Sequence, residues 1–471
     1  MNEFQNKTCA VIGLARAGAP AAQFLLERGA RVFGYDSKPR EGLSDEALEL
    51  EKNGAFIFCG NHEFQDIDGC DLIVLSPGLK VHYEPLKSVI EQAEARGAEV
   101  IGELELASRF CPCPIIGVTG TKGKSTTTKL ITEMLRACGV DAVSAGNTGT
   151  PLISVLPQLT PESWAVVEVS SFQLEKAPTF RPKIAVLLSL LEDHQDYHPT
   201  LEQYWETKLK IFANQVDGDV AVLNLDDERI YKKQTYIGGK GLSLHTTGKK
   251  LDDDITINDV EVYWEGDVLT CSSAQIISAD ELPLQGQHNR ANVSAALAAI
   301  LSVFGVEWGE VARKKERIAD AIRNFQTLPH RLEIVAQKDG ITWVNDSQST
   351  IPDASIAALK SFPSPVTLLV GGRAKIEASG YENLMRATKN EGTRLILFGE
   401  AAEMLCEVAS AQGVDKSQIF RKNTLADAVQ TAKMNASDGE SVILSPACAS
   451  FDQFNSYEHR GETFRQLVKE V

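Results

Sequence analysis

The chain has 471 residues, of which 43% are hydrophobic and 24% are charged, as in a folded protein of several domains. Its formal net charge of −17 argues against a general binder of nucleic acids or anionic membranes, because both partners are negatively charged. The chain lacks the long apolar run of a membrane span and the basic and apolar segments of a signal peptide. We therefore expect no membrane insertion and a cytoplasmic location.

The nine cysteines are scattered along the chain, several of them inside apolar runs. This distribution suits reduced, buried thiols in a cytoplasmic protein. Cys111 and Cys113 form the only close pair, and their spacing differs from the two-residue gap of zinc and redox motifs. The sequence therefore predicts no metal centre built from cysteines.

The N-terminal segment begins as a βαβ unit. An apolar strand at residues 8–13 leads into a glycine-containing loop, a helical pattern follows to residue 28, and a second strand at residues 30–36 ends in an acid. The loop resembles a dinucleotide-binding turn, but Ala15 replaces the middle glycine and would obstruct a pyrophosphate. A nicotinamide or flavin site is therefore disfavoured, whereas another nucleotide or phosphate at this helix N-terminus remains open.

Apolar strands alternate with helical patterns along the rest of the chain. The predicted strands are residues 71–75, 115–118, 164–169, 184–188, 220–223, 342–345, 366–370, 395–398 and 442–444. Such near-continuous apolar runs are typical of parallel sheets that are buried on both faces. Residues 231–285 carry shorter segments with Gly/Asp turns and predict a small antiparallel insert, followed by helices at residues 289–304 and up to residue 325.

These patterns predict an α/β protein with three consecutive domains. Gly102 follows a strand and is a natural hinge, and the segment Leu328-Pro329-His330-Arg331 reads as a second linker. We place the domains at residues 1–102, 103–328 and 329–471.

A glycine-rich loop follows the strand at residues 115–118. It reads Gly120-Thr121-Lys122-Gly123-Lys124-Ser125-Thr126 and is followed by an amphipathic helix. Backbone N–H groups at a helix N-terminus, a lysine and a hydroxyl that suits Mg²⁺ are what a phosphate site requires. The loop is shorter than the common P-loop, so the alternative is an ordinary strand-to-helix turn. The sequence favours an ATP site.

The shortened loop resembles that of the Mur ligases and their folate-polyglutamylating relatives. Further motifs of that family follow in order: EVSSFQLE at residues 168–175, EDH at 192–194, YWETK at 204–208, GQHNRAN at 286–292, PHR at 329–331, NDS at 345–347, GGRAK at 371–375 and LSPACASFDQF at 444–454. The resemblance covers nearly the whole chain. It implies an N-terminal Rossmann-like UDP-binding domain, a central P-loop-type ATPase domain and a C-terminal Rossmann-like domain that binds an amino acid.

Within the family, the chain most resembles the members that add D-glutamate to UDP-N-acetylmuramoyl-L-alanine in peptidoglycan precursor synthesis. The partners implied are those two substrates and ATP, handled by a monomer without nucleic acid or membrane insertion. The alternative is another Mur-type or folylpolyglutamate-type ligase that adds a different amino acid, for example L-glutamate. A regulator that keeps the fold without the chemistry is a further alternative, which the catalytic residues disfavour.

The resemblance implies four catalytic residues, Lys124, Glu168, His194 and Lys208. Lys124 would hold the β- and γ-phosphates, and Ser125, Glu168 and His194 would contribute to two Mg²⁺ sites. The family pattern implies that Lys208 reacts with CO₂ to form a carbamate. An ammonium group repels Mg²⁺, whereas a carbamate offers it oxygen ligands, and carbamate formation requires a neutral amine, hence a lysine of lowered pKa.

The remaining site residues are also implied by the resemblance. For ATP they are Gly120, Thr121, Lys122, Gly123, Lys124, Ser125, Thr126, Asn289, Asn292, Arg331 and Asp346. For the UDP substrate they are Gly13, Ala15, Arg16, Asp36, Ser37, Lys38, Ser76, Pro77, Gly78, Asn147, Thr148, Ser170 and His194. For the amino acid they are Thr350, Lys375, Ser450, Phe451 and Tyr457, with Lys375 paired to one carboxylate and Ser450 bonded to the other.

Two positions depart from the family pattern. The family commonly has lysine where Gln348 stands, and phenylalanine where Tyr457 stands. The missing cation bears on the amino-acid pocket and leaves room for a different amino-acid preference. The reaction class is unaffected, because the ATP and metal residues are intact.

Overall fold

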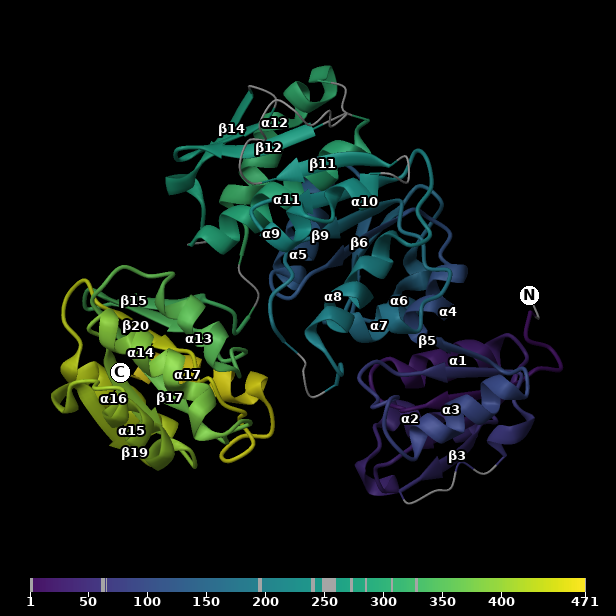
Figure 1. The fold of residues 1–471 in the computed structure, drawn as a ribbon, viewed down its shortest axis with the longest axis horizontal. Coiled ribbons are helices and arrows are strands. Elements are labelled where there is room, and N and C mark those ends of the chain that lie inside the picture. The colour runs from purple at the N-terminus through teal and green to yellow at the C-terminus, as the bar shows by residue number, and fades with distance from the viewer. Residues whose placement is uncertain are drawn as a thin grey trace. The chain divides into compact units, whose positions relative to one another are not determined.

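The computed structural model describes residues 3–60, 64, 66–193, 197–238, 242–247, 260–271, 274–283, 286–305, 308–326 and 329–470. The chain forms two compact units, Met1–Leu282 with Ala291–Phe325, and Pro283–Arg290 with Gln326–Val471. The first unit holds two sheets and the second holds one (Figure 1). The predicted boundary at residue 328 and the predicted ligand His194 lie outside the described residues.

The N-terminal sheet is parallel and has the order β3-β2-β1-β4-β5. Its strands are β1 (Thr8–Ile12), β2 (Arg31–Asp36), β3 (Phe56–Cys59), β4 (Leu72–Leu75) and β5 (Glu99–Gly102), and its helices are α1 (Gly18–Glu27), α2 (Asp45–Lys52), α3 (Leu86–Ala95) and α4 (Glu103–Arg109). Alternate residues of β1 face opposite sides: Cys9 and Val11 pack with α1, whereas Ala10 and Ile12 pack with α3. The strand order reverses between β1 and β4, where ligands bind in such sheets.

The central sheet has nine strands in the order β14-β13-β12-β11-β10-β9-β6-β8-β7. They are β6 (Ile115–Thr119), β7 (Ala142–Gly146), β8 (Trp164–Glu168), β9 (Ile184–Leu187), β10 (Val220–Asn224), β11 (Ser243–Thr247), β12 (Val260–Glu265), β13 (Val268–Cys271) and β14 (Ala274–Ser278). The helices of this region are α5 (Lys124–Ala137), α6 (Leu152–Val155), α7 (Ser171–Glu175), α8 (Leu201–Leu209), α9 (Glu228–Tyr231), α10 (Gln234–Gly238), α11 (Gln287–Val303) and α12 (Trp308–Arg323).

The predicted antiparallel insert at residues 231–285 is only partly antiparallel. Strands β12, β13 and β14 pair antiparallel, but β11 pairs parallel with β10, and β12 pairs parallel with β11. The insert therefore continues the main sheet, because β11 completes the backbone hydrogen bonds that β10 would otherwise leave open at an edge.

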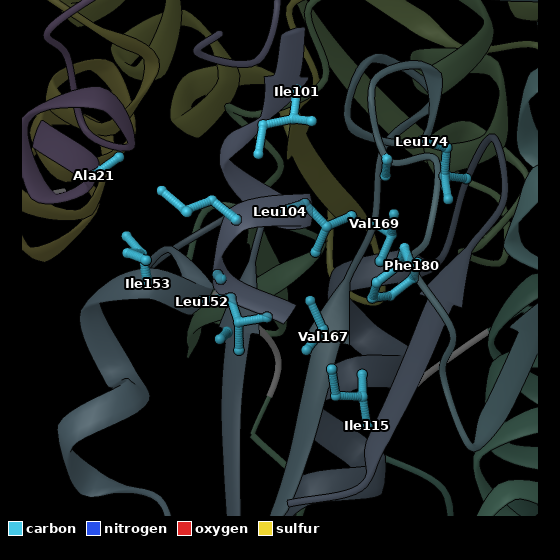
Figure 2. Close-up of a cluster of buried hydrophobic side chains, with 14 of the residues drawn as sticks. Ala21, Ile101, Leu104, Ile115, Leu152, Ile153, Val167, Val169, Leu174 and Phe180 are labelled. Atoms are coloured by element: carbon cyan, nitrogen blue, oxygen red, sulfur yellow. The ribbon is translucent and has the colours of Figure 1, made fainter. Parts of the chain in front are cut away.

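One apolar core joins the two sheets of the first unit. Figure 2 shows Ile101 of β5 and Leu104 of α4 in the same cluster as Ile115 of β6 and Val167 of β8. The cluster also contains Leu152 and Ile153 of α6. This packing makes the N-terminal and central sheets one compact unit.

The sheet of the second unit has the order β15-β16-β20-β17-β18-β19, and β15 is its antiparallel member. Its strands are β15 (Glu333–Lys338), β16 (Ile341–Asn345), β17 (Val366–Gly371), β18 (Arg394–Phe398), β19 (Ile419–Lys422) and β20 (Ser441–Leu444). Its helices are α13 (Pro352–Leu359), α14 (Glu382–Asn390), α15 (Ala402–Ala411), α16 (Leu425–Asn435) and α17 (Tyr457–Glu470). Leu368 and Val370 pack with α14 and α15 on one face, and Leu369 packs with α16 and α17 on the other. No helix in the described part of the chain has the length and apolar character needed to cross a bilayer.

Candidate active site

The phosphate loop lies where the sequence predicts it, between β6 and α5. Gly123 is the residue before α5 and has a φ of +86°, a conformation that glycine adopts without strain. A Cβ placed on Gly123 would come within 2.2 Å of the amide oxygen of Asn292. The backbone at this point therefore requires glycine, and Asn292 of α11 lies directly against the loop.

Two lysines converge on one carbonyl of this loop. The Nζ atoms of Lys124 and Lys208 donate hydrogen bonds to the carbonyl oxygen of Gly120 at 3.0 Å and 3.1 Å. Lys124 also donates to the carbonyl oxygen of Thr121 at 3.2 Å. The sequence places these lysines 84 positions apart (residues 124 and 208), so this meeting of two cations is a product of the tertiary fold.

Lys208 is buried although it lies on a helix with polar neighbours. It is 1% exposed, whereas Lys210 is exposed. Its Nζ atom lies 4.5 Å from the ring centroid of Tyr204, which precedes it by one helical turn. Burial, followed by the nearby charge of Lys124, holds the pKa of Lys208 well below its ordinary value. A larger fraction of Lys208 is therefore in the neutral amine form than is the case for an exposed lysine.

A carboxylate marks the end of the neighbouring strand. Glu168 is the last residue of β8 and is 3% exposed. Its Oε1 atom accepts a hydrogen bond from the Thr148 hydroxyl at 2.8 Å and a longer one from the Asn147 amide at 3.5 Å. The backbone N–H of Asn147 also donates to the carbonyl oxygen of Glu168 at 2.9 Å. The loop after β7 thus fixes the orientation of this carboxylate.

Within the described residues, no three or more His, Cys, Asp or Glu side chains come together to hold a metal ion, so a cation at Glu168 needs oxygen ligands of other kinds. Glu168, the hydroxyl of Ser125 and the proposed carbamate of Lys208 would all supply oxygen ligands, which Mg²⁺ prefers. Lys208 in its charged form would not fit, because an ammonium group repels a cation. Its burial and lowered pKa remove this conflict by favouring the neutral amine that CO₂ can modify.

The loop edge of the N-terminal sheet meets the central sheet through Arg16. Its guanidinium donates to the carbonyl oxygen of Asn147, beside the Glu168 carboxylate. A narrow pocket nearby is lined by Ser76, Pro77 and Gly78 together with side chains that follow β8. The loops predicted to hold the UDP substrate therefore lie beside the predicted reacting centre.

Asp36 and Ser76 organise the predicted UDP loops. The Asp36 carboxylate accepts the backbone N–H groups of Leu14 and Lys38 at 2.8 Å and 2.9 Å. The Ser76 hydroxyl donates to the carbonyl oxygen of Gly13 at 2.7 Å. Each carboxylate oxygen retains a second lone pair for a ligand hydroxyl. The predicted residues exposed along this edge are Ala15, Arg16, Ser37, Lys38 and Gly78.

Ser170 has a structural role. It is the N-cap of α7, where its hydroxyl accepts the backbone N–H of Gln173 at 3.3 Å. The side chain of Gln173 in turn accepts the backbone N–H of Ser170 at 3.0 Å, which completes a capping box. The predicted contact of Ser170 with the substrate remains a prediction.

In the second unit, two residues of the predicted amino-acid pocket meet. Lys375 donates to the hydroxyl of Thr350 at 2.9 Å. Ser450 is buried and Phe451 is 62% exposed on the loop after β20. Loops after β16, β17 and β20 carry these residues, and those three strands are adjacent and parallel. Their carboxyl ends share one edge of the sheet, where such folds bind ligands.

The two departures from the family pattern contact each other. The side-chain carbonyl of Gln348 accepts a hydrogen bond from Arg331 at 3.0 Å, and its amide donates to the hydroxyl of Tyr457 at 3.5 Å. The glutamine thus bridges the two residues through its neutral amide, in a place where a lysine would put a second cation beside Arg331.

Asp346 is buried at the end of β16. Its carboxylate accepts the hydroxyl of Ser445 at 2.7 Å and the backbone N–H of Leu332 at 3.2 Å. Burial raises its pKa to about 6, although these hydrogen bonds act in the opposite direction. Asn289, Arg331 and Asp346 belong to the second compact unit, and their role at the nucleotide remains a prediction.

The structure also shows site residues that the sequence did not single out. The hydroxyl of Tyr204 donates to Thr121 of the loop at 3.3 Å, and Lys122 pairs with Asp193 at 3.2 Å. Tyr204 stands four residues before Lys208, and that spacing alone places both on one helix face. Asp193 lies in the EDH motif, next to the predicted ligand.

Comparisons with known proteins identify the domain families that the chain matches. Three domain families match the chain: the MurD-like N-terminal domain of Mur ligases over residues 7–102, the Mur ligase middle domain over residues 118–300, and the Mur ligase glutamate ligase domain over residues 330–448.

Relatives match over the full length of the chain. A UDP-N-acetylmuramoylalanine--D-glutamate ligase of Pelotomaculum thermopropionicum is 36% identical over 468 residues, covering 99% of this chain and 98% of the relative. The protein of the same name in Geotalea uraniireducens is 37% identical over 473 residues, covering 100% and 98%.

Solved structures show the same fold at lower identity. The UDP-N-acetylmuramate-alanine ligase of Thermotoga maritima gives a TM-score of 0.59 at 15% identity, covering 99% of this chain and 100% of that chain. A pseudomurein peptide ligase of Methanothermus fervidus gives a TM-score of 0.57 at 18% identity, with the same coverage.

Proposed function

Because the chain belongs to the Mur ligase family, as its motifs predicted, we propose that it joins D-glutamate to UDP-N-acetylmuramoyl-L-alanine at the expense of ATP. The product is a precursor of the peptidoglycan peptide. The structural observation that supports the reaction most directly is the convergence of Lys124 and Lys208 on the phosphate loop, where Asn292 also lies.

The reaction activates a carboxylate before it forms an amide. The carboxylate of the L-alanyl group attacks the γ-phosphorus of ATP, the bond from that phosphorus to the bridging oxygen breaks, and ADP leaves. The amine of D-glutamate then attacks the acyl carbon, loses a proton, and phosphate leaves. Catalysis of phosphoryl transfer rests mainly on positioning and on neutralising charge.

The phosphate loop positions the triphosphate. The N–H groups at the start of α5 and the Lys124 ammonium bind the β- and γ-phosphates, as the geometry of a helix N-terminus favours. In the structure, Lys124 donates hydrogen bonds to the carbonyl oxygens of Gly120 and Thr121. Phosphate oxygens replace these neutral acceptors with charged ones, which form stronger hydrogen bonds with an ammonium group.

Two Mg²⁺ ions would be held by Ser125, Glu168, His194 and carbamylated Lys208. Bound Mg²⁺ neutralises the charge that develops on the phosphates and orients the substrate carboxylate. Thr148 and Asn147 hold the Glu168 carboxylate in one orientation. His194 is proposed from its motif alone.

Lys208 forms a carbamate with CO₂ in this proposal. The neutral amine attacks the carbon of CO₂, a nitrogen–carbon bond forms, and a proton leaves to solvent. The burial of Lys208 and the charge of Lys124 favour the neutral amine. The change turns a neutral amine into a negatively charged carbamate and provides oxygen ligands beside Glu168.

Substrate binding is divided between the two units. The loops around Gly13, Asp36 and Ser76 bind the UDP group. Arg16 and Asn147 contact the part of the substrate that extends from this group to Glu168. We propose that Thr350, Lys375, Ser450, Phe451 and Tyr457 bind the amino acid, and that Asn289, Arg331 and Asp346 bind the nucleotide. We also propose domains at residues 1–102, 103–328 and 329–471, in an enzyme that works as a cytoplasmic monomer and binds no nucleic acid.

Phosphate release from ATP by the purified chain tests the reaction. We expect release only when UDP-N-acetylmuramoyl-L-alanine and D-glutamate are both present. Equal turnover with L-glutamate, diaminopimelate or a folate would contradict the proposed substrate and favour another ligase of the same fold. Gln348 and Tyr457 make this comparison informative, because they change the surroundings of Arg331.

Lys208→Ala tests the carbamate. We expect turnover to fall by about 100-fold or more, as when a single electrostatic contact to a transition state is removed, with partial recovery on adding a short carboxylate. Lys210→Ala is the matched control, because Lys210 lies two residues after Lys208 but is exposed. Protein equilibrated with ¹³CO₂ should give a carbamate carbon signal that Lys208→Ala lacks; the same signal in both proteins excludes Lys208.

A further inference from the structure

Arg460 is a cation buried at the loop edge of the second unit, outside the residues assigned to substrates. It lies in the first turns of α17 and is 0% exposed. Among the described residues, no carboxylate lies within ion-pairing distance of its guanidinium. Burial lowers the pKa of Arg460 to about 10, so the group keeps its charge at neutral pH. A buried charge without an ion-pair partner is costly for the fold, which points to a functional reason for keeping it.

All five N–H donors of Arg460 are used, and all reach neutral oxygens. Nε donates to the Ser347 hydroxyl at 3.0 Å, and Nη2 donates to the carbonyl oxygens of Ser347 at 2.9 Å and Cys448 at 3.2 Å. Nη1 donates to the carbonyl oxygens of Cys448 at 3.1 Å and Gly371 at 3.5 Å. Five donors in a planar fork are specific to arginine, so lysine could not make this set.

These acceptors lie on three different loops. Ser347 follows β16, Gly371 ends β17, and Cys448 follows β20. Thr350 is three residues after Ser347, Lys375 is four after Gly371, and Ser450 is two after Cys448. Such short spans place each of these residues within about 7–14 Å along the chain of a bond to Arg460.

The backbone packs closely around the guanidinium and leaves no room for a side chain at Gly372. Gly372 has a φ of +123°, and a Cβ there would come within 2.2 Å of the Ala449 carbonyl oxygen and 3.0 Å of Nη1 of Arg460. Arg373, the residue after Gly372, exchanges two backbone hydrogen bonds of 2.9 Å with Ala449. The loops after β17 and β20 are thus tied both to each other and to Arg460.

We propose that Arg460 is a positioning residue for the amino-acid substrate, which holds the loops bearing Thr350, Lys375 and Ser450 in one arrangement. This inference rests on the proposed function, because it takes those three residues as the amino-acid pocket. Removing the guanidinium lets the loops move independently, and the pocket then binds the amino acid less well. The ATP and UDP-substrate contacts on the first unit do not depend on it.

Steady-state kinetics of Arg460→Lys and Arg460→Met test this role. We expect the KM for the amino acid to rise at least tenfold in both, while the KM for the UDP substrate changes less than about twofold and kcat falls less than the amino-acid KM rises. Arg460→Lys with wild-type kinetics, or equal changes in the KM values for the amino acid and the UDP substrate, would overturn the proposal.

Two further variants separate positioning from stability. Arg465→Met, on the same helix as Arg460, removes ion pairs with Glu333 of β15 and Glu462 of α17, and we expect it to lower Tm without changing the amino-acid KM. Ser347→Ala removes one acceptor of Arg460 and should raise the amino-acid KM about threefold. If the Arg460 variants do not fold, an unchanged amino-acid KM in Ser347→Ala overturns the proposal. If the wild-type chain prefers another amino acid, the proposed substrate fails, and the same comparison is made with the KM of that amino acid.

Discussion

Glu103 gives a quantitative prediction of how stability depends on pH. It is the first residue of α4, at the junction of the N-terminal and central sheets, and is 1% exposed. One oxygen accepts the backbone N–H of Ile153 at 3.0 Å, and the other has no partner among the described residues. Burial raises its pKa from 4.5 to about 7. We predict that Glu103→Gln removes a loss of stability that the wild-type chain suffers as pH rises.

The sign follows from proton binding. Below pH 4.5 both the folded and unfolded chains hold the proton, so burial of this group carries no ionic penalty. Between 4.5 and about 7 the folded chain holds more protons than the unfolded chain, and stability falls with rising pH. At 1.36 kcal/mol for each tenfold change, the penalty is about 1 kcal/mol at pH 5 and about 3 kcal/mol at pH 8. Glutamine titrates at neither pH.

Urea unfolding at pH 5 and pH 8 measures this difference. Glu103→Gln should gain about 2 kcal/mol relative to wild type between the two values. The buried amide has its own effect on stability, but that effect is independent of pH and cancels. Glu99→Gln is the control, because Arg109 lowers the pKa of Glu99 and its contribution is nearly constant above pH 5. An equal effect of Glu103→Gln at both pH values would refute the reasoning.

Two substitutions test the phosphate loop and the metal site. Gly123→Ala should abolish ATP binding by calorimetry while the second unit stays folded, because its Cβ would lie 2.2 Å from the Asn292 amide oxygen; unchanged affinity would show that the loop adapts. Thr148→Val removes the 2.8 Å hydrogen bond to Glu168. It should lower kcat about tenfold and raise the Mg²⁺ concentration needed for half-maximal activity, as loss of an orienting contact does. A change in the KM for ATP alone would contradict this.

The strands that the sequence missed have one property in common. Outside the insert at residues 231–285, apolar runs predicted the interior strands, but they did not predict β3, β7, β15 and β19. Each of the four lies at an edge of its sheet. An edge strand has one neighbour and more exposed side chains, and β15, for example, contains no fully buried residue. β7, β15 and β19 therefore lack the apolar run by which buried parallel strands are recognised. β3 (Phe56–Cys59) is an apolar run that was missed, and none of its residues is fully buried.

The sequence by itself determined the α/β class, the order of the domains and the family, because these depend on local patterns: apolar runs, a glycine loop before a helix, and short motifs in order. Only the tertiary structure decided which charged groups are buried and which meet. It buries Lys208 but not Lys210 on one short segment, and it joins Arg460 to three loops. Burial and contact between distant segments depend on packing, which no local pattern records.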